Sequence, residues 1–119
     1  MKKILVVEDG EVERELMRLA LEREGYGVIT AEDGVRGFEL ALAERPDLII
    51  TDFWMPAADG VHLVRRVRTT PELSSTPVIV TTGFGTGSAT LTLAQGADAY
   101  VPKPLDPDAL RETVRRLLS

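Results

Sequence analysis

The chain has 119 residues, a formal net charge of −5 and no cysteine. This length suits a single domain spanning residues 1–119, and the lack of cysteine excludes disulfide bonds, thiol catalysis and thiolate metal sites. The acidic excess argues against direct binding to nucleic acid or to an anionic membrane. The apolar run at residues 4–7 is too short for a signal peptide or a membrane span, so we expect a cytoplasmic domain without membrane insertion.

Five short apolar runs rich in β-branched residues predict strands at residues 4–7, 28–31, 48–51, 78–81 and 99–101. Most of these runs are continuously apolar rather than alternating. That pattern is typical of strands covered on both faces, as in a parallel sheet.

Amphipathic segments between the runs predict helices. Their apolar stripes are Val12, Leu16, Leu19 and Ala20; then Phe38, Ala41 and Leu42 before Pro46; then Leu63, Val64 and Val67; and finally Leu110, Val114, Leu117 and Leu118. The last helix is expected to begin at Asp106-Pro107-Asp108, with an N-cap, a proline in the first position and a carboxylate facing the helix dipole. The weakest helix prediction is residues 88–95, which are uncharged and follow three glycines.

The alternation of strands and helices indicates an α/β fold: a doubly wound parallel sheet of five strands, with right-handed crossovers and helices on both faces. In such a sheet, ligands bind at the carboxyl ends of the strands. The residues expected at that edge are polar: Glu8 and Asp9, Asp52, Thr82 and Lys103.

Each of these residues alone could be an ordinary turn or capping residue, but together they form a chemical set. Three carboxylates suit a hard, oxygen-preferring cation, Mg²⁺ before Ca²⁺. A carboxylate can also act as a nucleophile on phosphorus and form an acyl phosphate, while an ammonium and a cation neutralise the transferring group. The alternating Gly83, Gly85 and Gly87 do not form a nucleotide-binding loop, and the cluster Arg65-Arg66-Arg68 is expected on a solvated or salt-bridged face.

Several segments together resemble the receiver domain of two-component response regulators, and especially the stand-alone regulators of the chemotaxis type. They are residues 4–9, 46–52, Met55-Pro56, Asp59-Gly60, 77–83, Gly96-Ala97 and 100–104. The resemblance covers essentially the whole chain and implies the flavodoxin-like receiver fold with strand order 2-1-3-4-5.

The resemblance assigns the metal and acceptor residues. It implies that Asp52 accepts a phosphoryl group. It also implies that Glu8 and Asp9 hold Mg²⁺ together with Asp52 and the backbone carbonyl of Trp54.

The resemblance also assigns the switch. Thr82 and Lys103 are implied to contact the phosphoryl group, and Tyr100 is the implied switch aromatic, whose rotamer follows Thr82. The Lys103–Pro104 bond is typically cis in this family. Trp54 and Phe84 replace polar residues found in many members, so we expect slow autodephosphorylation.

The implied function is a phosphorylation-activated switch of a two-component or phosphorelay system, not an enzyme beyond Mg²⁺-dependent self-phosphorylation from a phosphodonor. The implied partners are a sensor histidine kinase or a histidine phosphotransfer protein, and a downstream protein that binds the face from strand 4 to the last helix. The implied oligomeric state is a monomer or a weak, phosphorylation-dependent dimer.

Other functions remain open at this point. The chain could be the N-terminal receiver domain of a longer regulator with a DNA-binding or enzymatic output domain. It could be a receiver-like interaction module that works without phosphorylation, although such modules usually lose part of the acceptor set. A flavodoxin-like cofactor carrier is disfavoured because residues 8–11 would repel a phosphate in the absence of a metal. A hydrolase of the aspartyl-phosphate type would need a cap and a second acid close after Asp52, which residues 53–55 do not provide.

Overall fold

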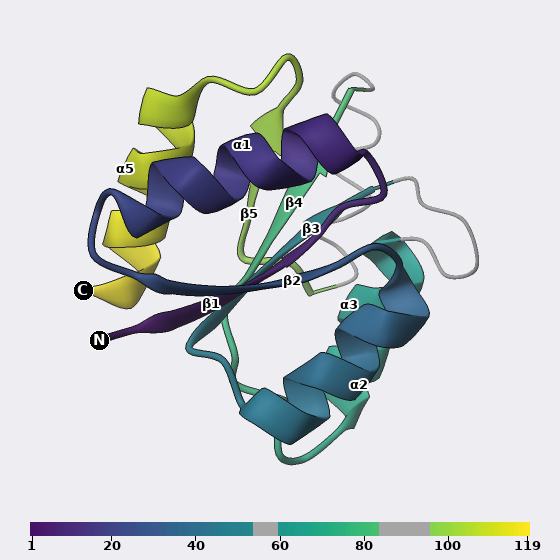
Figure 1. Ribbon diagram of the computed structural model, residues 1–119. Coiled ribbons are helices and arrows are strands. Elements are labelled where there is room, and N and C mark those ends of the chain that lie inside the picture. Colours follow the sequence, from purple (N-terminus) through teal and green to yellow (C-terminus); the bar gives the residue numbers. More distant parts are fainter. Residues whose placement is uncertain (54–59, 84–95) are drawn as a thin grey trace.

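Five parallel strands form a sheet, and helices cover both of its faces (Figure 1). The computed structural model describes residues 1–53, 60–83 and 96–119. In chain order the elements are β1 (Lys3–Val7), α1 (Glu11–Glu22), β2 (Gly27–Ala31), α2 (Gly34–Glu44), β3 (Leu48–Asp52), α3 (Gly60–Thr69), β4 (Val78–Thr82), β5 (Ala99–Pro102) and α5 (Pro107–Leu118). The strand order is β2-β1-β3-β4-β5, which confirms the predicted doubly wound sheet. The predicted helix at residues 88–95 lies outside the described residues.

The two faces of the sheet carry separate apolar cores, because successive side chains of a strand point to opposite faces. Ile4 and Val6 of β1 pack with α1 and α5, whereas Leu5 and Val7 pack with α2 and α3. In Figure 1, α1 and α5 lie together on one side of the sheet and α2 and α3 on the other.

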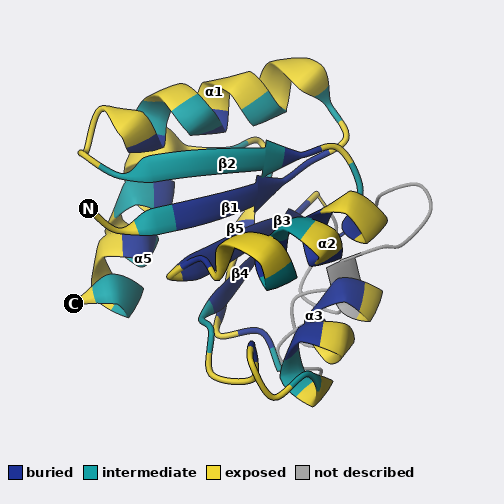
Figure 2. Ribbon diagram, turned by 60° about the horizontal axis from the view of Figure 1, so that its bottom comes forward, coloured by how far each residue is buried: buried dark blue, intermediate teal, exposed yellow. Residues whose placement is uncertain are grey.

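Burial along the strands follows their position in the sheet (Figure 2). Every residue of β3 and β4 is buried, as the continuous apolar runs predicted. The edge strand β2 is mostly half-buried, and the other edge strand, β5, alternates between buried and exposed residues. The buried central strands therefore have well-defined ends, and these ends fix the positions of the polar residues that follow them.

The first helix buries a different face from the one its sequence predicted. Met17 and Leu21 are its buried residues, whereas Val12, Leu16 and Leu19 are exposed. Consecutive helical residues lie about 100° apart, so Leu16 and Met17 cannot both face the sheet. The helix carries two apolar stripes, and the one that packs on the sheet leaves the other uncovered.

The other helices bury the predicted positions. Their buried residues include Phe38 and Ala41, Leu63, Val64 and Val67, and Leu110 and Val114, while Leu42, Leu117 and Leu118 are only partly buried. The predicted start of α5 is confirmed: the Asp106 carboxylate accepts a hydrogen bond from the Asp108 amide at 3.0 Å.

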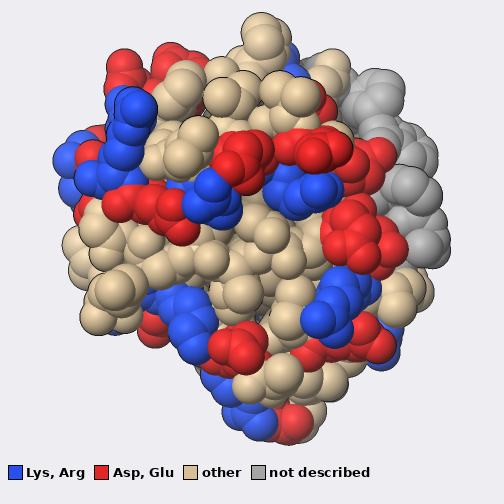
Figure 3. Space-filling model, in the orientation of Figure 1, with Lys and Arg blue, Asp and Glu red and all other residues tan. Residues whose placement is uncertain are grey.

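The exposed side of α1 is strongly charged. Arg18 pairs with Glu15 and Glu22 along the helix, and Figure 3 shows a row of alternating acidic and basic side chains over this element. Among the described residues, no helix is long and apolar enough to cross a membrane.

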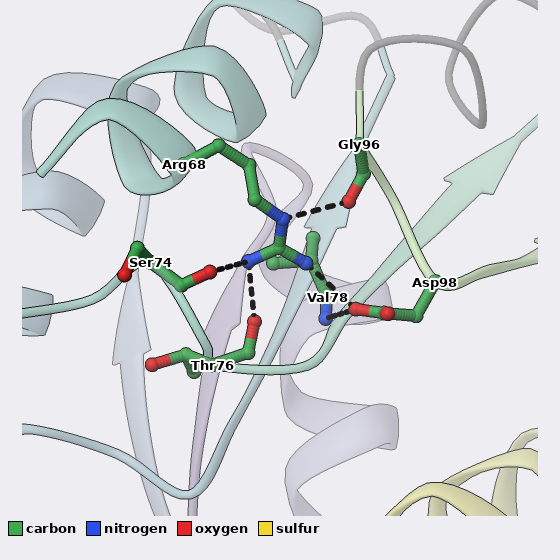
Figure 4. Close-up of polar contacts among 6 residues, drawn as sticks. All are labelled: Arg68, Ser74, Thr76, Val78, Gly96 and Asp98. Carbon is green, nitrogen blue, oxygen red and sulfur yellow. Dashed lines mark hydrogen bonds and ion pairs between the residues drawn. The ribbon is translucent and has the colours of Figure 1, made fainter. Parts of the chain in front are cut away.

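Arg68 connects three segments at the edge of the sheet where β4 and β5 begin (Figure 4). Its Nε donates to the Gly96 carbonyl at 2.9 Å, and Nη1 donates to the Thr76 carbonyl at 2.7 Å. Its Nη2 pairs with Oδ2 of Asp98 at 2.7 Å, and the same oxygen accepts from the Val78 amide at 2.8 Å. The sequence predicted a solvated or salt-bridged residue, but Arg68 also ties the end of α3 to the starts of two strands.

Candidate functional site

Three carboxylates meet at the carboxyl edge of the sheet. The parallel register pairs Val7 of β1 with Thr51 of β3, so Glu8 follows β1 beside Asp52 at the end of β3. Glu8 is 1% exposed and Asp52 is 7% exposed, whereas Asp9 lies at the surface. One carboxylate oxygen from each of the three residues lies within 4.8 Å of the others.

The ammonium of Lys103 lies between the two buried acids. Nζ is 3.2 Å from Oδ2 of Asp52 and 3.3 Å from Oε1 of Glu8. The Lys103 amide donates to the Thr82 carbonyl at 2.7 Å, which holds the residue at the end of β5. The peptide bond from Lys103 to Pro104 is cis, as the resemblance implied.

Burial controls the protonation of Glu8. The pKa of its carboxyl group is raised from 4.5 to about 7 in all. Desolvation is the largest cause and the negative charge of Asp52 adds to it, whereas the hydrogen bond from the Gly10 amide and the charge of Lys103 act in the opposite direction. The Gly10 amide donates to Oε2 of Glu8 at 3.0 Å. Burial by itself would lower the pKa of Lys103, but the charges of Asp52 and Glu8 outweigh it, so the pKa of the ammonium is raised. One ammonium thus contacts two of the three acids, and the three acids outnumber it.

This donor set fits a hard divalent cation. Carboxylate oxygens are the ligands that Mg²⁺ prefers, and Mg²⁺ commonly binds through a few carboxylates while keeping positions for water and phosphate oxygens. Among the described residues, Glu8, Asp9 and Asp52 form the one group of acidic or histidine side chains with this spacing.

The remaining predicted residues lie at different places around this edge. Thr82 ends β4 and is 1% exposed, whereas Tyr100 is 40% exposed on the edge strand β5. Trp54 and Phe84 lie outside the described residues. Of the predicted site residues, the structure thus places Lys103 in direct contact with Glu8 and Asp52.

Two further side chains at this edge were not predicted. Arg14 donates from Nη1 to the Glu8 carbonyl at 2.9 Å. Thr81 has a fully buried hydroxyl that finds no hydrogen-bond partner in the described part of the chain. The two-residue period of a strand could have indicated Thr81, because it puts this side chain on the same face as Ile79, toward α1 and α5.

A family model described as the response regulator receiver domain matches residues 4–115. The chain belongs to this family. Receiver domains interact with histidine kinases and downstream effectors in general.

Known receiver proteins resemble the chain in sequence and in structure. It is 41% identical to the transcriptional regulatory protein CseB of Streptomyces coelicolor over 97% of the chain and 48% of CseB. The chemotaxis response regulator CheY4 of Vibrio cholerae superimposes with a TM-score of 0.94 at 33% identity, covering 99% of both chains. The chain spans about half the length of the curated relatives it matches.

A third relative bears on the metal. The receiver domain of the sensor histidine kinase PA1611 from Pseudomonas aeruginosa matches with a TM-score of 0.91 at 28% identity over 98% of this chain and 97% of that one. Its crystal structure has a magnesium ion coordinated in the active site cleft. Receiver domains bind Mg²⁺ at an acidic site, and this chain has an acidic cluster of the kind that could hold it.

Proposed function

We propose that the domain is a phosphorylation-activated switch in which Asp52 accepts a phosphoryl group from a sensor histidine kinase or a histidine phosphotransfer protein. The observation that carries the proposal is the contact of Lys103 with both Asp52 and Glu8. A carboxylate that is almost buried beside a second acid is costly for folding. The arrangement is explained if the site is built to bind a cation and to hold a phosphoryl group on Asp52 beside the ammonium of Lys103.

The chemistry follows from the groups in contact. A carboxylate oxygen of Asp52 attacks phosphorus, the bond from phosphorus to the donor's histidine nitrogen breaks, and the electron pair of that bond stays on the imidazole, which then takes up a proton. The product is an acyl phosphate on Asp52. Lys103 neutralises charge on the transferring group, and the Thr82 hydroxyl donates a hydrogen bond to one of its oxygens.

Glu8, Asp9 and Asp52, with the backbone carbonyl of Trp54, would hold Mg²⁺. When bound, the ion neutralises the carboxylates and the charge that develops on the phosphoryl oxygens. Small phosphodonors would then also serve, so the domain would phosphorylate itself from acetyl phosphate and lose the group slowly.

Phosphorylation shifts an equilibrium between two states of the domain. The ammonium of Lys103 then pairs with the phosphoryl group on Asp52, and the side chain of Tyr100 follows the movement of Thr82. Tyr100 is exposed on β5, so its rearrangement alters the surface from β4 to α5, where a downstream protein binds. In this proposal the domain is cytoplasmic and monomeric, or forms a weak dimer when phosphorylated.

A second possibility concerns the output. CseB is a transcriptional regulatory protein about twice the length matched here, so the switch is also consistent with an N-terminal receiver domain, residues 1–119, that controls a further output domain. The switch chemistry is the same in both cases.

Intact-mass analysis after incubation with Mg²⁺ and acetyl phosphate tests the proposal. We expect the wild type to gain the mass of one phosphoryl group and Asp52→Asn to gain none. Asp108→Asn makes the same chemical change at an exposed position of α5, and this control should be phosphorylated like the wild type. Equal labelling of Asp52→Asn and the wild type would contradict the assignment of Asp52. The absence of any labelling, even with a cognate kinase, would favour a phosphorylation-independent interaction module.

A further inference from the structure

A groove of about 480 Å³ runs between α1 and the segment that joins β5 to α5. Its walls include Leu16, Leu19 and Ala20 from α1, and Leu105 and Leu110 from the opposite side. This volume lies within the range of small-molecule sites in proteins, and mostly apolar walls are typical of them.

Folding leaves one wall of this groove uncovered. Leu16 is 60% exposed and Leu19 is 43% exposed, and these residues belong to the stripe of α1 that does not pack on the sheet. Figure 3 shows a largely uncharged surface beside the charged row of α1, on the side toward the connection between β5 and α5. Contiguous exposed apolar surface of this kind marks a binding site more often than scattered apolar residues do.

A buried hydroxyl lies at the inner end of the groove. Thr81 lines the groove and is fully buried, and its Oγ1 has no hydrogen-bond partner within the described part of the chain. Most buried polar side-chain atoms are paired, because an unpaired one loses its hydrogen bonds to water without replacement. A ligand with a hydrogen-bonding group at this end would supply the missing partner.

The positive charge at the inner end is already paired. Lys103, which also lines the groove, is shared by Glu8 and Asp52, so it offers no unpaired positive charge to an anion. Arg111, farther out, pairs with Asp108. An acidic group placed beside Thr81 would be repelled by two carboxylates, whereas an uncharged group would not.

We propose that this groove binds a small molecule with an apolar body and one uncharged hydrogen-bonding group, a hydroxyl or a carbonyl, which pairs with Thr81. The site shares Lys103 and the following Pro104 and Leu105 with the edge that holds the carboxylates. A bound ligand would therefore give the domain an input separate from phosphorylation. The binding itself requires neither phosphorylation nor Mg²⁺, so it does not depend on the proposed function.

Titration of the unphosphorylated domain with 2-naphthol, followed by amide NMR shifts, tests the proposal. We expect saturable shifts at residues 16–20, at Thr81 and at residues 105–110. Naphthalene-2-sulfonate has the same ring system and a charged group, and it should bind several-fold more weakly. Thr81→Val keeps the shape of the side chain and removes the hydroxyl, so we expect about a fivefold loss of affinity for 2-naphthol and no loss for naphthalene.

A pair of variants controls for the groove itself. Ala20→Phe fills the space between the walls and should abolish binding, whereas Val35→Phe makes a comparable enlargement at an exposed position of α2 and should leave binding unchanged. The spectra report whether each variant is folded.

Four results would overturn the proposal. The first is an absence of saturable shifts in the wild type, and the second is an unchanged affinity of Thr81→Val for 2-naphthol. The third is equal or tighter binding of the sulfonate, which would point to an acidic ligand paired with Arg23 at the other end of the groove. The fourth is a change of the same shifts with protein concentration alone, which would make the groove a contact between two copies of the chain.

Discussion

The ammonium of Lys103 lies 3.2 Å from the carboxylate of Asp52, across the gap between the ends of β5 and β3. The same ammonium reaches Glu8 at 3.3 Å. Lys103 thus compensates the charge of two side chains that are almost inaccessible to water. The contribution of Lys103 to stability can be separated from its contribution to phosphoryl transfer. One substitution removes the positive charge, and another keeps the charge but changes the shape of the charged group.

Removal of the charge should destabilise the fold in a pH-dependent way. Lys103→Met leaves Glu8 and Asp52 without a counter-charge, and we expect a loss of about 3 kcal/mol in the free energy of unfolding at pH 8 without Mg²⁺. At pH 5 the loss should be smaller, because Glu8, with a pKa of about 7, then carries a proton. Urea unfolding at both pH values measures the difference. Lys3→Met removes an exposed pair with Glu44 and should cost no more than about 1 kcal/mol at either pH; equal losses for the two variants would contradict the role given to Lys103.

A change of shape should spare the fold but impair the switch. Lys103→Arg keeps the positive charge, so we expect stability within about 1 kcal/mol of the wild type. The planar guanidinium is broader than an ammonium and should crowd a phosphoryl group bound to Asp52. The uptake of phosphate from acetyl phosphate should be reduced, and so should the NMR shifts that phosphorylation causes along β4 and β5. A variant that matches the wild type in both measurements would show that the site does not select an ammonium.

Magnesium should stabilise the domain through its acidic cluster. At ten times its dissociation constant, a ligand that binds only the folded state adds about 1.4 kcal/mol, which raises Tm by about 5 °C for a domain of this size. Asp9 is exposed, so Asp9→Asn should fold normally and lose most of this shift. Asp108→Asn, at an exposed site on α5, should retain it. Thermal unfolding across a Mg²⁺ titration decides the matter, and an equal shift in Asp9→Asn would exclude Asp9 as a ligand.

The raised pKa of Glu8 predicts how stability depends on pH in the absence of Mg²⁺. The folded state holds a proton on Glu8 up to about pH 7, whereas the unfolded chain releases it near pH 4.5. The folded state therefore binds more protons in this interval, and the free energy of unfolding falls as the pH rises through it. Glu8→Gln lacks the titrating group, so the stability of the wild type should decline relative to this variant between pH 4.5 and 7. Parallel curves for the two proteins, measured by urea unfolding with a chelator present, would show that the carboxyl group is not desolvated.

The sequence predicted the sheet and the edge of the site because both depend on local pattern. Continuous runs such as residues 48–51 indicate central strands, and the ends of parallel strands meet at one edge, so Glu8, Asp52 and Lys103 were expected to lie near one another. The buried face of α1 was predicted wrongly, because its two apolar stripes are similar and only contact with the sheet decides between them. The contacts of Arg68 were missed for a different reason: most of its partners are backbone carbonyls, which have no signature in the side-chain sequence.

The contacts of the planar Arg68 guanidinium lead to a prediction about stability. An ammonium cannot replace it, because the carbonyls of Gly96 and Thr76 and the carboxylate of Asp98 lie in different directions around one guanidinium (Figure 4). We expect Arg68→Lys to lower the free energy of unfolding by about 2 kcal/mol, since it leaves partly buried acceptors unpaired. Arg65→Lys makes the same change at an exposed position of α3 and should stay within about 0.5 kcal/mol of the wild type.

A double-mutant cycle with Asp98→Asn separates the ion pair from the carbonyl contacts. If Arg68 acts through Asp98, the two substitutions together should cost less than the sum of their separate effects, by about 1 kcal/mol. The Val78 amide also donates to Asp98, so Asp98→Asn alone should weaken the start of β4, and faster amide exchange at Val78 would report this locally. Additive losses, together with unchanged exchange at Val78, would mean that Arg68 acts through the backbone carbonyls and not through Asp98.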